Sequence, residues 1–324
     1  MRHATSMSMA ERERGAAILT AMLTVVLVAA LAASAMWQQW RSIEVEAAER
    51  SRTQSAWILT GALDWARLIL REDARKGGAD HLAEPWALPL EQARLSTFLA
   101  ADRNDALAAE ESQDAFLSGS IIDLQSRLNV TNLVQGGKVD EPSQRAFERL
   151  FEVLNLSAGE LSVLIDKLRR AQTSTAAGGD LALPLWPQQL EDLAWLGVSP
   201  GTVARLRDYV TILPVPTPVN LNTAAAETIY ACVPGFELAD ANHLLRAREQ
   251  THFSSLADAI KASGNPATKL TEGQHSVATR FFEVRGRLQV EQTAVQEFSL
   301  VQRDGLEVKV LTRRRGVTPP APLQ

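Results

Sequence analysis

Hydrophobic residues first gather in one uninterrupted run, from Ala16 to Trp37. No ionisable residue occurs between Arg14 and Arg41. As a helix, these roughly 22 residues would reach about 33 Å, enough to cross the hydrocarbon core of a bilayer. The pattern therefore predicts a transmembrane helix over residues 16–37.

Beyond the apolar run, the sequence predicts that the same helix continues over residues 38–76. No proline or glycine occurs between Ala16 and Gly61. Further along, one helical face is predicted from residues spaced four, three and four apart: Ile58, Ala62, Trp65 and Ile69. We expect this face to pack on a sheet, with Trp57 and Trp65 in the core. The alternative is that both tryptophans face partner helices.

The rest of the chain changes its hydrophobic period twice. Residues 119–133 favour a strand, whereas residues 142–262 follow helical spacing, as in Phe147, Leu150 and Leu154. After Gly273 the period becomes two, which predicts antiparallel strands joined by a hairpin turn at Asp304-Gly305. Strands do not alternate with the helices, so we expect an α+β fold with a large all-α domain inserted between strands, not a parallel sheet.

These shifts in pattern set the expected domain boundaries. The segments are a leader (1–15), a transmembrane helix (16–37), its continuation (38–76), the first part of an α/β body (77–134), an inserted helical domain (135–275), an antiparallel β-meander (276–315) and a disordered tail (316–324). We expect the basic run Arg313–Arg315 to be a solvated terminus.

Composition narrows the functional classes. The net charge of −5 over 324 residues offers no basic field for nucleic acid. The single cysteine, Cys232, excludes an intrachain disulfide and a cysteine zinc cage, and its apolar neighbours favour a core position. The five histidines lack metal-ligand spacing, and no catalytic motif is present. We expect no enzymatic activity.

Charge also predicts the topology. Arg2, Arg12 and Arg14 precede the apolar run, which favours a cytoplasmic amino terminus and, in a bacterium, a periplasmic body on a single span of the inner membrane. Three mature forms remain open. The chain is processed after Gly15, cut by signal peptidase after Ala35, or left as an uncleaved anchor.

The sequence resembles one family over nearly its whole length, the minor pseudopilin K proteins of bacterial type II secretion systems. A charged leader ending in Gly15 before an immediate hydrophobic helix is typical of type IV pilin-like precursors. Two internal elements make the resemblance more specific. They are Ile122-Asp123-Leu124-Gln125-Ser126-Arg127-Leu128-Asn129-Val130-Thr131-Asn132-Leu133 and Val219-Asn220-Leu221-Asn222-Thr223-Ala224.

The resemblance implies a fold, a function and partners. It implies a pilin-like body in which a long amino-terminal helix lies on a small antiparallel sheet. It also implies a place at the tip of the pseudopilus, with the minor pseudopilins I and J as partners. Prepilin peptidase would cut between Gly15 and Ala16 and would be able to methylate the Ala16 amine.

One position departs from the wider pilin superfamily. Most members carry a glutamate shortly after the cleavage site, where this chain has Thr20. A carboxylate in the bilayer is costly unless it is paired, whereas a threonine hydroxyl can return to a carbonyl one turn back. We expect Thr20 to free the subunit from pairing with one above it. The expected contacts with partner helices are Ile18, Leu19, Leu23 and Leu27.

Calcium is the one cofactor that the resemblance raises. Family members can bind calcium through acidic clusters in the helical domain. The corresponding stretch here offers Asp180, followed by Glu191 and Asp192, which falls short of the several neighbouring carboxylates that calcium prefers. We therefore expect no metal.

Residues 219–262 also resemble a helix-hairpin-helix module. The hairpin Pro234-Gly235 carries Glu237 and Asp240, which would repel phosphate, so we expect it to pack against protein. Two alternatives to a secretion pseudopilin stay open. One is a membrane-tethered DNA-binding component of an uptake apparatus that uses Arg246 and Arg248. The other is a plain periplasmic scaffold without pilin processing.

Overall fold

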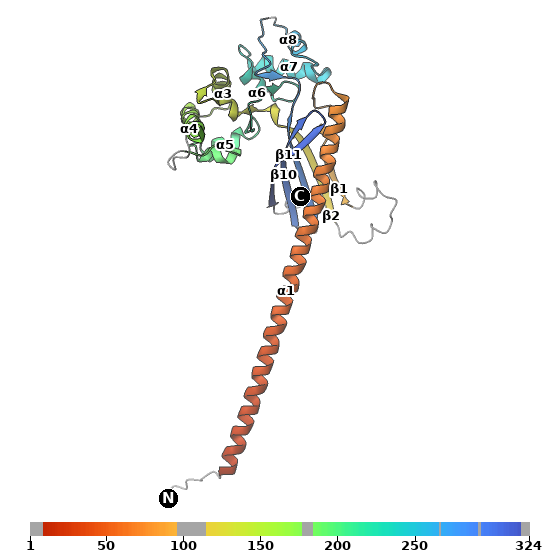
Figure 1. Cartoon of the computed structure of the whole chain (residues 1–324), viewed down its shortest axis with the longest axis vertical. Helices are drawn as coiled ribbons and strands as arrows, with labels where there is room; N and C mark the ends of the chain where they lie inside the picture. Colours follow the sequence, from red (N-terminus) through yellow and green to blue (C-terminus); the bar gives the residue numbers. More distant parts are fainter. Residues whose placement is uncertain (1–8, 96–114, 177–183, 266, 291–292, 319–324) are drawn as a thin grey trace, which may run out of the picture. The chain divides into compact units, whose positions relative to one another are not determined.

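The computed structural model describes residues 9–95, 115–176, 184–265, 267–290 and 293–318 (Figure 1). The chain divides into two compact units, Met1–Ile58 and Leu59–Gln324. One helix, α1 (Met9–Lys76), supplies all the described structure of the first unit and the beginning of the second.

The first unit is an exposed apolar helix. Every residue from Ala16 to Ile43 is exposed, including all the large hydrophobic side chains of the predicted span. The helix is long and apolar enough to cross a membrane, with a window of mean hydropathy 2.5. An apolar surface of this kind needs a nonaqueous partner, either lipid or other helices.

The second unit is built on a five-stranded antiparallel sheet of order β1-β2-β9-β10-β11. Its strands are β1 (Leu90–Arg94), β2 (Ala115–Asp123), β9 (Phe281–Val290), β10 (Thr293–Asp304) and β11 (Glu307–Thr318). The expected turn joins β10 to β11, with Gly305 at a φ of 57°. The α+β prediction is confirmed.

The carboxy-terminal part of α1 packs on one face of this sheet. Leu63, Ala66 and Leu70 are buried against Phe282 and Val301 of the strands. The predicted packing face was wrong by one residue. Ile58, Ala62 and Ile69 are only half-buried, Trp65 is 44% exposed and Trp57 is 72% exposed, so neither tryptophan is a core residue.

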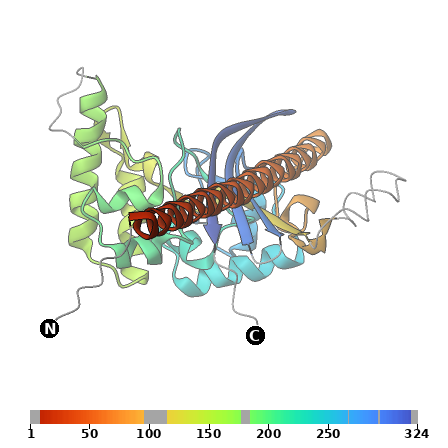
Figure 2. The same cartoon turned by 90° about the horizontal axis from the view of Figure 1, so that it is seen from below.

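The helical insert lies between β2 and β9 in the sequence. In Figure 2 its green helices, α3 to α5, gather on one side of the blue strands. Its elements are η3 (Leu124–Ser126), β3 (Leu128–Asn129), η4 (Val130–Leu133), β4 (Val134–Gln135), β5 (Lys138–Val139), α3 (Glu141–Val153), α4 (Ala158–Ala176), η5 (Leu190–Ala194), α5 (Pro200–Leu206), β6 (Val210–Thr211), β7 (Val219–Asn220), α6 (Ala226–Cys232), α7 (Leu238–Gln250), α8 (Leu256–Ala262) and β8 (His275–Ser276). A single large core of helix side chains holds the insert together, including Phe147, Leu164 and Ile229.

Two predicted boundaries were wrong. The strand expected over 119–133 ends at Asp123, because the side chains of Asp123 and Asn129 accept hydrogen bonds from the backbone N–H groups of Gln125 and Thr131 and start 3-10 turns. The β-meander begins at Phe281, since β8 pairs with β7 of the insert, and it continues past residue 315 to Thr318. The rest of the expected tail, 319–324, lies outside the described residues.

The basic run is not a solvated terminus. Arg313 and Arg315 both donate hydrogen bonds to Glu297, whose side chain is 3% exposed. The two arginines thereby compensate a buried carboxylate on the face of the sheet that α1 covers. Residues two apart on a strand point to the same face, so Arg313 and Arg315 lie on the same side of β11.

Candidate functional site

The expected processing and partner positions all lie on α1. Helical structure continues through Gly15 and Ala16 without a break. Four positions expected to contact partner helices are exposed: Ile18 (61%), Leu19 (69%), Leu23 (68%) and Leu27 (59%). These side chains are therefore free to contact another apolar surface.

Thr20 satisfies its hydroxyl within its own helix. Its Oγ1 donates to the carbonyl oxygens of Ala17 at 2.9 Å and Ala16 at 3.1 Å. This is the local bond expected from the sequence. Thr20 therefore needs no polar partner from a second subunit, whereas a carboxylate at this depth in lipid would need one.

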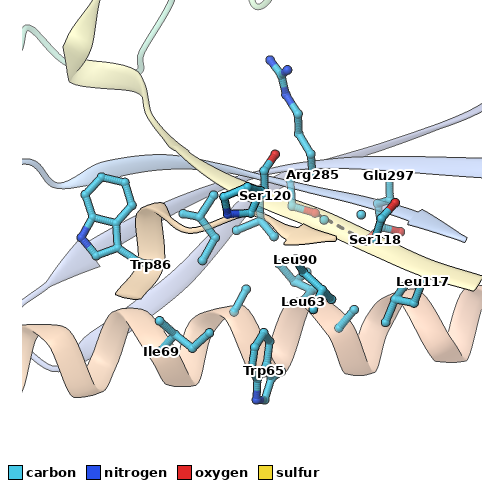
Figure 3. A pocket seen from close by; sticks show the side chains of 18 of the residues that line it. Leu63, Trp65, Ile69, Trp86, Leu90, Leu117, Ser118, Ser120, Arg285 and Glu297 are labelled. Carbon is cyan, nitrogen blue, oxygen red and sulfur yellow. Dashed lines mark hydrogen bonds between the residues drawn. The ribbon is translucent and has the colours of Figure 1, made fainter. Parts of the chain in front are cut away.

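A groove beside α1 is the second surface with exposed apolar side chains. Its volume is about 250 Å³, and Figure 3 shows Trp65 and Ile69 of α1 on one side and Trp86 and Leu90 on the other. Trp86 is buried and makes an edge contact with Phe282, with ring centroids 5.2 Å apart. Three of the four residues of the stripe that the sequence predicted as core, Ala62, Trp65 and Ile69, thus line this groove.

Glycines allow the helix to approach the sheet here. Gly119 of β2 and Gly286 of β9 are paired in register. A Cβ atom on Gly286 would lie 3.2 Å from a methyl group of Leu59, and one on Gly119 would lie 2.8 Å from the carbonyl oxygen of Arg285. A side chain at Gly119 would therefore force the backbone of β2 or β9 to move, whereas one at Gly286 would require the Leu59 side chain to shift.

The two family-like motifs meet in a buried polar network, here called the junction network (Asp123, Asn220, Thr223 and Thr279). Asp123 Oδ2 accepts from Asn220 Nδ2 at 3.0 Å and from Thr223 Oγ1 at 2.6 Å. Asp123 Oδ1 accepts from Thr279 Oγ1 at 2.6 Å. Burial raises the pKa of Asp123 to about 6, although these hydrogen bonds favour the charged form. The network ties the end of β2 to the helical insert.

Other amides in the same motifs extend this connection. Asn129 Nδ2 donates to the carbonyl oxygen of Val215, and Asn132 exchanges two hydrogen bonds with the backbone of Thr217. Asn222 does the same with the backbone of Phe253, at 2.9 Å in each direction. These side chains therefore act as structural connectors between segments far apart in the sequence.

Sequence reasoning missed an ion network next to the junction. Arg303 donates to Asp73 Oδ2 at 2.6 Å and also to Asp80, and all three side chains are at most 10% exposed. Glu84 lies close by, and its pKa is raised to about 7, chiefly by burial. Because the Arg303 guanidinium already lies among these carboxylates, the arrangement is that of a structural ion network. No sequence spacing linked residues from α1, a loop and β10.

The two calcium candidates that the structure describes, Glu191 and Asp192, each have a local partner. Asp180 lies outside the described residues. Asp192 is buried and accepts from the backbone N–H groups of Gln188 and Gln189 at the start of η5, while Glu191 pairs with Arg207. The two described acids thus have local structural roles.

In the helix-hairpin-helix segment the basic residues have different environments. Arg248 Nη1 donates to the carbonyl oxygens of Leu221 at 2.7 Å and Ala224 at 2.6 Å, and burial lowers its pKa to about 10. Arg246 is exposed on α7, and its Nε donates to the carbonyl oxygen of Asn242 within the same helix. Arg248 is therefore committed to protein packing. Cys232 is buried in the same core, and burial raises its pKa to about 12.

Comparison with known proteins gives consistent matches. Sequence profiles described as "Type II secretion system (T2SS), protein K" match residues 126–215 and 219–278. The chain is 26% identical to type II secretion system protein K of Pseudomonas aeruginosa, with 94% of this chain and 93% of the relative covered. It is 28% identical to the protein of the same name from Klebsiella pneumoniae, with 95% and 98% covered.

A solved structure shows the same fold. The match is to a chain in the crystal structure of the GspK-GspI-GspJ complex from the type 2 secretion system of enterotoxigenic Escherichia coli, with a TM-score of 0.60 and 15% identity. It covers 83% of this chain and 98% of that chain. The two profiles cover most of both motifs, including Asn220 and Thr223 of the junction network, whereas Asp123 and Thr279 lie just outside the matched residues. The chain is thus similar in sequence to type II secretion system protein K over nearly its whole length, and similar in fold to a chain of the GspK-GspI-GspJ complex.

Proposed function

We propose that this protein is a non-enzymatic minor pseudopilin at the tip of the type II secretion pseudopilus. It assembles with the minor pseudopilins I and J to initiate or cap the filament that drives protein secretion across the outer membrane. Assembly with I and J is the state of the similar chain in the GspK-GspI-GspJ complex.

One observation carries the proposal, the long exposed apolar helix in which both threonines bond back to the helix's own backbone. Within residues 16–37, Thr20 and Thr24 each donate to a carbonyl of the preceding turn. The helix surface is thus compatible with lipid and with neighbouring helices. A subunit without a carboxylate at position 20 needs no subunit above it, which suits the first position in a filament.

Processing follows from the same segment. Prepilin peptidase cuts after Gly15 and leaves Ala16 as the mature amino terminus, which is open to methylation. The body lies in the periplasm and the span in the inner membrane, consistent with the arginines that precede the apolar run. The helical insert supplies the bulk that prevents another subunit from stacking on top.

Photo-crosslinking in membranes tests the assembly. A photoreactive amino acid at Leu23 or Leu27 of the full chain, produced together with pseudopilins I and J, is expected to yield adducts with one or both. The control position is Leu185, which is 79% exposed in the insert. Full membrane insertion without any adduct from Leu23 or Leu27 would contradict the proposal.

A further inference from the structure

A second surface of the body carries a charge opposite to that of the whole protein. A cleft of about 490 Å³ lies between the insert and the face of the sheet opposite α1. We call it the basic cleft. The charged residues that line it are five arginines, Arg127, Arg207, Arg285, Arg314 and Arg315, and two glutamates, Glu191 and Glu283. The whole chain has a net charge of −5, so this excess of positive charge is local.

The strands arrange these cations in order. Arg285 of β9, Phe298 of β10 and Arg314 of β11 are paired in register across the sheet. In Figure 3 the Arg285 side chain points away from α1, toward the other face of the sheet. Phe298 and Leu300 supply an apolar floor between the two arginines. The cleft therefore offers both apolar contact and positive charge.

Two of the arginines have no carboxylate partner. Arg285 pairs with Glu283, Arg207 pairs with Glu191 and Arg315 pairs with Glu297. Arg314 donates instead to the neutral side-chain oxygen of Gln189 at 2.6 Å. Across the described parts of the chain, Arg127 is half-buried and makes no direct hydrogen bond or ion pair; burial lowers its pKa, and the charge of Glu283 opposes this only in part. A half-buried guanidinium without a partner is costly, and an anion in the cleft would relieve that cost.

The cleft adjoins an open edge of the sheet. β11 is the terminal strand, and its residues 311–316 are exposed. Near its start, Arg67 of α1 donates to the carbonyl oxygen of Val308 at 2.9–3.0 Å and covers the edge there. Over 311–316 the described residues make no backbone bond on the side away from β10. Free N–H and C=O groups on a long edge strand can pair with a strand from another chain.

We propose that the basic cleft and the open edge of β11 together form a docking site for an extended acidic segment of another protein. The segment adds a strand beside β11. Alternate side chains of that strand face the cleft, where carboxylates meet Arg127 and Arg314 and apolar groups meet Phe298. In any strand, alternate side chains point to the same face, so a segment paired with the edge of β11 presents every second side chain to the cleft. One extended acidic segment therefore satisfies both the edge and the cleft. The proposal goes beyond assembly through the membrane helix and does not depend on it.

A labelled peptide tests the proposal directly. The probe is a short peptide of alternating glutamate and valine with a fluorescent label, titrated against the full chain in detergent and followed by anisotropy. We expect saturable binding that weakens as salt is raised. Arg127→Gln and Arg314→Gln should each weaken binding about tenfold, the effect of losing one charged hydrogen bond. Arg145→Gln, an exposed arginine on α3, is the matched control and should leave binding unchanged.

Control peptides separate strand pairing from simple charge. Replacing glutamate by glutamine, or alternate valines by proline, should abolish binding, because the first removes the carboxylates and the second removes backbone donors. Unchanged binding by Arg127→Gln and Arg314→Gln would overturn the proposal. Equal binding of the proline peptide, or displacement of the probe by a DNA duplex as efficient as by unlabelled peptide, would identify a general anion site and overturn it as well.

Discussion

Asn220 and Asp123 are 97 residues apart in the sequence, and a 3.0 Å hydrogen bond from Asn220 Nδ2 to Asp123 Oδ2 joins them. Asp123 ends β2, and Asn220 lies in β7 of the helical insert. Both side chains are at most 3% exposed. This contact joins the point where the chain leaves the sheet to a strand in the middle of the insert, and Thr279, just before β9, bonds to the same carboxylate, so Asp123 fixes the insert to the body.

Removing the charge of Asp123 should destabilise the protein. In Asp123→Asn, an amide nitrogen replaces one of the two acceptor oxygens. If it replaces Oδ2, it faces the donors of Asn220 and Thr223, and if it replaces Oδ1, it faces the donor of Thr279. We expect a loss of about 2–3 kcal/mol in the free energy of unfolding, measured by urea titration of the detergent-solubilised chain with circular dichroism. Asp208→Asn, at an exposed position, should change it by less than about 0.5 kcal/mol. Equal effects would contradict a junction role.

Glu84 should make stability depend on pH near neutrality. Its pKa rises from 4.5 to about 7 in the folded protein. The folded state therefore binds the proton more tightly than the unfolded state. The stabilisation is complete below pH 4.5 and is lost as the pH rises to about 7. Glu84→Gln mimics the protonated form and does not titrate. As the pH is raised from 5 to 7.5, the free energy of unfolding of the variant should therefore increase by about 1–2 kcal/mol relative to that of the original protein. Parallel stability curves for the two proteins would contradict the raised pKa.

Arg248 and Arg246 should differ in their effect on folding. Arg248→Met removes two short bonds to the carbonyls of Leu221 and Ala224, so we expect a loss of about 2 kcal/mol. Arg246→Met should have little effect, since its bond is local to α7. Thermal unfolding measures both variants. If the two arginines instead served DNA binding, both would affect a gel-shift with duplex DNA and neither would be needed for stability.

Substitutions of Trp65 and Trp86, which both line the groove beside α1, should separate an effect on folding from an effect on assembly. Trp86→Ala empties a buried site and should cost about 3–5 kcal/mol. Trp65→Ala removes a side chain that is 44% exposed and should cost less than about 1 kcal/mol. Under the proposed function, Trp65→Ala should still lower the yield of co-purified pseudopilins I and J by about tenfold. Normal recovery of both partners would leave the groove without a role in assembly.

The sequence predicted the elements that depend on local pattern. The apolar run, the hairpin at Asp304-Gly305 and the Thr20 bond follow from neighbouring residues alone. It failed where tertiary contacts decide. The helix face shifted by one residue because Leu59 packs over Gly286, and this glycine comes from a strand more than two hundred residues later.

The polar interior was harder to predict than the hydrophobic core. Arg303, Asp73 and Asp80 have unremarkable sequence settings and meet only through the fold. Arg313–Arg315 resembled a solvated tail until the strand placed two of the three arginines beside Glu297. Charge pairs between distant strands leave no periodic signal, whereas apolar faces do.

The mass of the mature chain purified from bacterial membranes tests the central claim most directly. The account predicts a membrane-embedded polypeptide that begins at Ala16, with or without one methyl group on its amine. It also predicts that Gly15→Leu leaves the full precursor uncut and stops secretion. A mature chain that begins at Met36, or a Gly15→Leu variant that supports normal secretion, would contradict the account.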